Sequence, residues 1–84
     1  MSLLIENIRL KLINNLKLKD LKIIDNTFLH EKHTSFSKEK LHLKLIINSP
    51  ELKVKSTLES NRIIYSMLKE ELKNNIHSLQ IQFE

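Results

Sequence analysis

The chain has 84 residues and a formal net charge of +4 at pH 7, and it contains no cysteine and no glycine. This length is typical of a single domain with a modest core, so we expect one domain over residues 1–84 and no large catalytic cleft. Without cysteine it has no disulfide, thiolate zinc site or cysteine nucleophile, and without glycine it has no phosphate-binding loop of the Walker or dinucleotide type.

The first predicted element is an amphipathic helix over residues 2–16, which Ser2 can cap. Its apolar stripe comprises Ile5, Ile8, Leu12 and Leu16, with Leu4 and Ile13 widening it. No apolar run approaches the ~20 residues that a membrane-spanning helix needs. The chain shows no secretory apolar region either, so we expect a soluble, cytoplasmic protein without a membrane partner.

Two strands are predicted next, at residues 21–25 and 41–47, separated by a polar loop at 26–39. The loop carries His30 and His33, and loops of this length are typically functional or mobile. In the second strand Leu41, Leu43, Leu45 and Ile47 share one face, and His42 alternates out of phase with them. We therefore expect His42 to face away from the main core, in a structural or interfacial role.

A helix is predicted over residues 56–74, capped by Ser56 or Thr57, with a buried stripe of Ile64, Tyr65, Leu68 and Leu72. A last strand covers 76–83, with an apolar face of Leu79, Ile81 and Phe83 and with His77 in phase. The first two strands should pair antiparallel, and a right-handed crossover places the last strand parallel to its partner. The prediction is an α+β fold: a three-stranded mixed sheet with helices packed on one face.

Several segments in the same order resemble the BolA family. Residues 61–65 (Asn-Arg-Ile-Ile-Tyr) and 76–79 (Ile-His-Ser-Leu) resemble its signature, residues 25–33 its histidine-bearing loop, and residues 41–43 its Thr-His-Phe strand entry. The resemblance covers nearly the whole chain. It implies an αββααβ fold like that of class II KH domains, in which segment 56–74 divides into a short turn and a long helix.

The resemblance implies an adaptor, not an enzyme, in iron–sulfur cluster trafficking or in iron and stress regulation. The implied partner is a monothiol glutaredoxin, with which the chain shares a 2Fe–2S cluster. Glutaredoxin and glutathione would supply thiolates, and this chain would supply the metal ligand His77 with His33, or else His30, as the second. The isolated chain is expected to hold no cofactor and to be a monomer or weak homodimer.

From the residues alone these histidines keep other interpretations. Strand periodicity alone favours a core or strand-edge role for His77. His30 and His33 are also consistent with solvated loop side chains, or with adventitious binding of Zn²⁺ or Ni²⁺ together with Glu31. No Ser–His–acid set and no carboxylate pair supports an enzyme.

The alternative function is a transcriptional regulator that binds DNA or another nucleic acid through the KH-like surface, with Lys53, Lys55 and Arg62 as contacts. Two departures from the family pattern disfavour it. The family's glycine is Val54, which hinders close approach to phosphate, and the family's Arg-His before Arg62 is Ser60-Asn61. The lysines are also spread along the chain among ten acidic residues.

Overall fold

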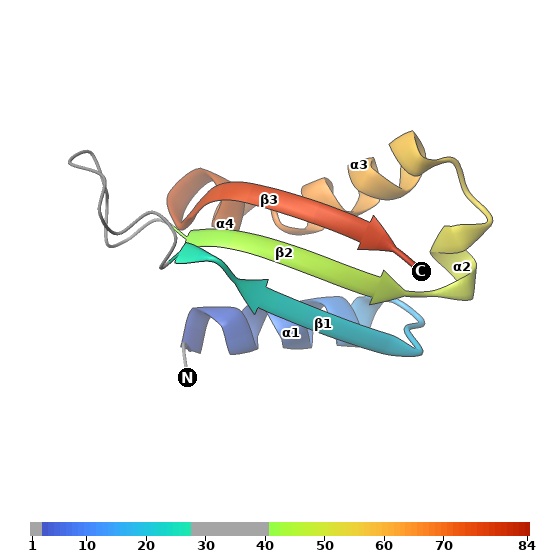
Figure 1. Cartoon of the computed structure of the whole chain (residues 1–84), viewed down its shortest axis with the longest axis horizontal. Helices are drawn as coiled ribbons and strands as arrows, with labels where there is room; N and C mark the ends of the chain where they lie inside the picture. The colour runs from blue at the N-terminus through green and yellow to red at the C-terminus, as the bar shows by residue number, and fades with distance from the viewer. Residues whose placement is uncertain (1–2, 28–40) are drawn as a thin grey trace.

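The computed structural model describes residues 3–27 and 41–84. The elements follow the order α1 (Leu3–Asn15), β1 (Asp20–Asp25), β2 (Leu41–Asn48), α2 (Pro50–Lys53), α3 (Thr57–Met67), α4 (Lys69–Asn74) and β3 (Ile76–Phe83). The arrangement confirms the α+β class and the αββααβ framework, although the helical region before the last strand has three segments (Figure 1). In these residues no helix combines the length and the apolar character needed to cross a membrane.

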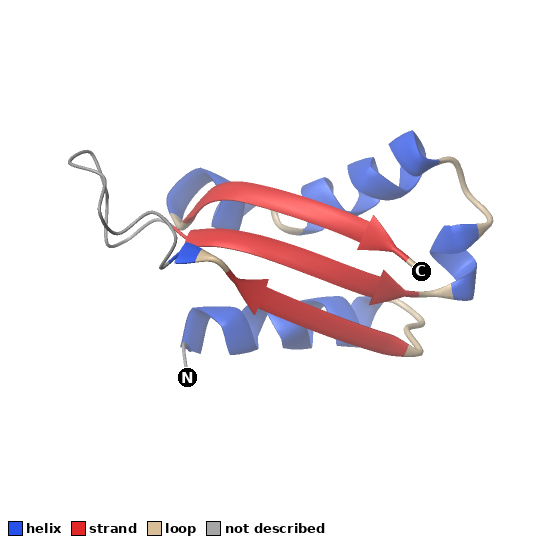
Figure 2. Cartoon of the chain, viewed as in Figure 1, coloured by secondary structure: helices blue, strands red, loops and turns tan. Residues whose placement is uncertain are grey.

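The three strands form one sheet in the order β1-β2-β3 (Figure 2). β1 runs antiparallel to β2, and β3 runs parallel to β2, as the sequence predicts. Because β2 and β3 are parallel, both begin at the same end of the sheet, and both end near α2 and the C-terminus (Figure 1). This topology brings the start of β3 beside the start of β2.

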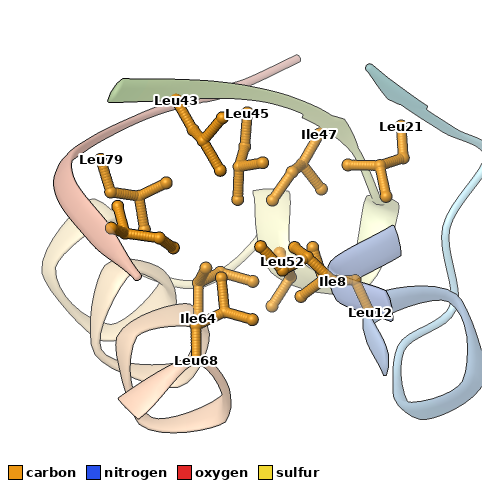
Figure 3. Close-up of a cluster of buried hydrophobic side chains, with 11 residues drawn as sticks. Ile8, Leu12, Leu21, Leu43, Leu45, Ile47, Leu52, Ile64, Leu68 and Leu79 are labelled. Atoms are coloured by element: carbon orange, nitrogen blue, oxygen red, sulfur yellow. The ribbon is translucent and has the colours of Figure 1, made fainter. Parts of the chain in front are cut away.

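The core lies between the sheet and the helices, which cover one of its faces (Figure 3). The alternation predicted for β2 is confirmed, because Leu43, Leu45 and Ile47 point into this layer and are buried. Helix α1 contributes Ile8 and Leu12, which are fully buried. The opposite face of the sheet therefore carries the intervening residues of each strand and stays accessible.

The helical region between β2 and β3 differs from the prediction of one helix over 56–74. The segment is divided, as the resemblance implies, but the longer helix α3 comes before the shorter α4. Ser49 caps α2, accepting a hydrogen bond from the Leu52 N–H at 3.3 Å, and Pro50 stands at its first position. Ser56 caps α3 as predicted, with its hydroxyl 3.1 Å from the Glu59 N–H. Leu68, with φ −103° and ψ 20°, then separates α3 from α4. Periodicity does not detect this interruption, because Leu68 is buried on the same stripe as Ile64.

Two residues of the predicted apolar stripes lie at the surface. Ile13 on α1 is 47% exposed, and Tyr65 on α3 is 42% exposed. Tyr65 nevertheless makes a hydrogen bond, because its hydroxyl donates to the Leu79 carbonyl at 3.0 Å. The predicted cap of α1, Ser2, lies outside the described residues.

Candidate functional site

A β-bulge at the start of β3 decides where His77 points. Leu41 is opposite Ile76 and His42 is opposite Ser78, so His77 is the extra residue of β3 between two consecutive pairs. Ile76 and Leu79 are consequently both buried, whereas His77 and Ser78 are both exposed. The prediction that His77 lies in phase with the apolar face is wrong, because the bulge shifts the alternation by one residue.

The exposed His77 ring packs against the His42 ring of the neighbouring strand. The two ring centroids are 4.9 Å apart, and the ring planes differ by 29°. His42 lies on the accessible face of β2, opposite to Leu43, so the prediction that it faces away from the main core is confirmed. The structure thus places two imidazoles side by side at one end of the open face of the sheet.

Hydrogen bonds hold His42 from three directions. Its Nδ1 lies 2.8 Å from the Ser78 hydroxyl on β3. Its backbone N–H donates to the Thr27 hydroxyl at 3.1 Å, and its carbonyl accepts from the Asn26 N–H at 2.7 Å. The Thr27 hydroxyl in turn donates to the Asp25 carboxylate at the end of β1. The network therefore joins all three strands at the end of the sheet that carries His77.

The two predicted loop ligands, His30 and His33, lie outside the described residues. Thr27 and Leu41, the described residues that flank positions 28–40, are both next to the histidine pair. Thr27 bonds to His42, and the Leu41 N–H donates to the Asn75 carbonyl at 2.8 Å, directly before β3. The segment with His30 and His33 is thus attached to the sheet at the end that carries His77.

The three predicted basic contacts lie at the other end of β3. The Lys53 Nζ donates to the Phe83 carbonyl at 3.4 Å, at the end of the strand. Lys53 and Lys55 line one surface hollow, Arg62 lines a second of about 440 Å³, and Ile81 is common to both. These side chains therefore lie along the end of β3 that is remote from His77.

Within the described residues, two imidazoles lie close together at the histidine end of the sheet, those of His42 and His77. No group of three or more His, Cys, Asp or Glu side chains gathers at one point within residues 3–27 and 41–84. The neutral imidazole nitrogen is a suitable ligand for iron and can replace thiolate in an iron–sulfur cluster.

Sequence reasoning missed the role of His42 as the neighbour of His77. Its position opposite Ser78 depends on the bulge, which strand periodicity does not predict. One signal was available in the sequence. Ile76 and Leu79 are both apolar and three residues apart, and a regular strand cannot bury both on one face. That spacing indicates an extra residue between them, with His77 or Ser78 displaced to the open face.

Comparisons with known proteins agree with this architecture. The family model for BolA-like proteins matches residues 12–84. The structure is similar to the BolA domain of SufE1 from Arabidopsis thaliana, with 31% identity, a TM-score of 0.85 and coverage of 100% of this chain and 93% of that chain. It is also similar to BolA1 from Arabidopsis thaliana, with 25% identity, a TM-score of 0.82 and coverage of 99% and 92%.

A bol-like protein from Babesia bovis shares the fold, with 19% identity, a TM-score of 0.71 and coverage of 93% of this chain and 79% of that chain. No curated protein sequence gives a significant match.

Proposed function

This chain belongs to the BolA-like protein family, and we propose that it is a non-enzymatic adaptor that shares a 2Fe–2S cluster with a monothiol glutaredoxin. The observation that carries the proposal is the His77 imidazole, which the bulge turns out to the open face of the sheet. A ligand for a cluster held between two proteins must be accessible to both, and a buried histidine would not be. The proposed setting is iron–sulfur cluster trafficking or iron and stress regulation.

The side chains available in this chain support a cluster whose ligands come from two proteins. The chain has no cysteine, so its contribution to a cluster would be imidazole nitrogen. Histidine ligation of one cluster iron raises the reduction potential relative to thiolate ligation, as in Rieske centres. In the proposal His77 is the first ligand, and the glutaredoxin and glutathione supply the thiolates, as the family resemblance implies.

His33, or else His30, is the proposed second ligand. His30 is three residues from Thr27, and an extended chain spans at most roughly 10 Å over three residues. His33 is six residues from Thr27, a span of roughly 20 Å by the same measure. Thr27 is hydrogen-bonded to His42, whose ring packs on His77. Chain connectivity therefore allows either histidine to reach His77.

The test is to mix the chain anaerobically with a cluster-loaded monothiol glutaredoxin and to record the visible absorption and circular dichroism. A heterodimer should form, and its spectrum should differ from that of the glutaredoxin homodimer because imidazole replaces thiolate. His77→Ala should abolish this difference while keeping the fold. If the wild-type mixture keeps the homodimer spectrum and forms no heterodimer, the proposal fails.

Gln80→Ala is the matched control for His77→Ala. Gln80 lies on the same strand and is also exposed, but it is beyond the bulge and pairs with Lys44. Its substitution should leave the heterodimer spectrum unchanged. His33→Ala and His30→Ala, compared separately, identify the second ligand as the one whose loss alters the spectrum.

The alternative function is nucleic-acid binding at the far end of β3. The specific observation in its favour is that Lys53, Lys55 and Arg62 line adjoining hollows that meet at Ile81. Binding of this kind should weaken steeply with salt, and each lost phosphate contact should reduce the log–log slope by roughly 0.9 for duplex DNA. Binding that persists after Lys53→Glu, Lys55→Glu and Arg62→Glu would contradict this alternative.

A further inference from the structure

We propose that His42 is a positioning residue, which holds the His77 ring in one orientation on the open face of the sheet. The proposal rests on the proposed function, because it assigns a role within the same cluster site. It is carried by the packing of the two rings at 4.9 Å and by the hydrogen bonds of His42. His42 is not among the ligands that the sequence predicts, and its role here is to act through His77.

His77 needs such a partner because of where it stands in the strand. It is the extra residue of a bulge, and its side chain is exposed. Exposed side chains exchange among staggered rotamers, and ordering a flexible side chain on binding costs free energy. A ring packed against one face of the imidazole removes part of this freedom before the cluster arrives.

His42 is well suited to restrict that freedom, since its own position is fixed from both neighbouring strands. Thr27 and Asn26, which follow β1, bind its backbone, and Ser78 on β3 binds its Nδ1. Ser78 directly follows His77, so the hydrogen bond ties the His42 ring to the side chain of the first residue after the bulge. Residues that orient a metal ligand in this way typically change metal affinity 10–100-fold when they are removed.

The first test uses the free chain and needs no cluster. NMR three-bond couplings that report χ1 of His77 should indicate one dominant rotamer in the wild type and averaging in His42→Ala. Ser78→Ala should give part of this averaging, and Ser78→Thr, which retains the hydroxyl, should restore the wild-type values. Lys44→Ala is the control, because Lys44 is the next residue along β2 on the same face as His42.

The second test uses the complex with the cluster-loaded glutaredoxin. In His42→Ala the cluster-bound heterodimer should be about tenfold weaker. The EPR g values of the reduced cluster should also shift, because the His77 ring orientation changes. The affinity of the two proteins without the cluster should not change. His42→Phe, which keeps a flat ring against His77 but lacks Nδ1, should fall between His42→Ala and the wild type.

Three results would overturn the positioning role. One is an unchanged His77 rotamer in His42→Ala. Another is an unchanged cluster signal in a His42→Ala complex of wild-type affinity. The third is complete loss of the heterodimer spectrum in both His42→Ala and His42→Phe, as in His77→Ala, which would make His42 a ligand itself. If the wild type forms no heterodimer, the proposed function fails, and the rotamer measurement still decides whether His42 orders His77.

Discussion

The two ends of β3 lie beside different sets of predicted functional residues, and they are built differently. At the start of the strand, the His42 side chain contacts Ser78 and His77 on β3, and the Thr27 hydroxyl after β1 accepts from the His42 backbone N–H. At the other end, the buried Ser60 hydroxyl donates to the Leu52 carbonyl, and the basic side chains of Lys53, Lys55 and Arg62 line two surface hollows. The comparison teaches that side-chain contacts and clustered charge are separate signals, because one distinguishes the histidine end of β3 and the other distinguishes the basic end.

The largest effect is expected at Leu79, the first buried residue after the bulge. Leu79→Ala removes a core side chain that the bulge brings inward, so the free energy of unfolding should fall by about 2–4 kcal/mol. Urea denaturation measures the change, and amide exchange should reveal more opening at the start of β3 than at its end. Gln80→Ala should change stability by less than about 0.5 kcal/mol. If the amides opened equally along the whole of β3 in this variant, the two ends of the strand would not differ in local stability.

The next largest effect is expected at Ser60, with Ser78 as the residue for comparison. Ser60, 1% exposed, donates from its hydroxyl to the Leu52 carbonyl at 2.7 Å and thereby fastens α3 to α2. Ser60→Ala removes this donor, while the Lys55 N–H still donates to the same carbonyl at 3.2 Å, so the free energy of unfolding should fall by about 0.5–1.5 kcal/mol in thermal or urea unfolding. Ser78→Ala, at the exposed histidine end, should cost less than about 0.5 kcal/mol. Equal costs would mean that the two ends are not built differently.

Most of the fold follows from the spacing of apolar residues. The alternation in β2 and the stripe with Ile8 and Leu12 are sufficient to predict the sheet, α1 and the buried layer. The interruption at Leu68 could not be predicted, because a residue can keep its place in a stripe while its backbone leaves the helical region. The helix at Pro50 was missed for a related reason, since four residues are too few for a periodic signal.

The candidate site was predicted less completely than the fold. The resemblance identified His77, but its exposure depends on pairing across strands, which is a tertiary property. The pairing of His42 with Ser78, and hence the contact between the two rings, follows from that same register. For Ser60, the sequence suggests the loss of a functional residue, whereas the structure gives it a structural role. In the sequence it is a lost basic residue of the family motif, whereas in the structure it is a buried hydrogen-bond donor.

A smaller effect is expected at Tyr65, which lies between the two ends. Its hydroxyl donates to the outward carbonyl of Leu79 on the edge strand β3. Tyr65→Phe keeps the ring and removes this hydrogen bond, so the free energy of unfolding should fall by about 0.5–1.5 kcal/mol. The half-buried setting allows water to replace the hydroxyl, which favours the lower part of the range. A loss above about 2 kcal/mol would indicate that water does not replace the hydroxyl and that the Leu79 carbonyl is left without a donor.

The smallest effect is expected from neutralising the basic end in the triple variant Lys53→Gln, Lys55→Gln and Arg62→Gln. From His77 to Phe83 the strand extends roughly 20 Å at about 3.3 Å per residue. This exceeds the screening length of about 8 Å at physiological ionic strength, so these charges should hardly affect ligation at His77. The visible spectrum of the glutaredoxin complex should therefore match that of the wild type, while His77→Ala abolishes it. If the triple variant no longer formed the glutaredoxin complex, the partner would have to contact both ends of β3, and the two ends would belong to one binding surface.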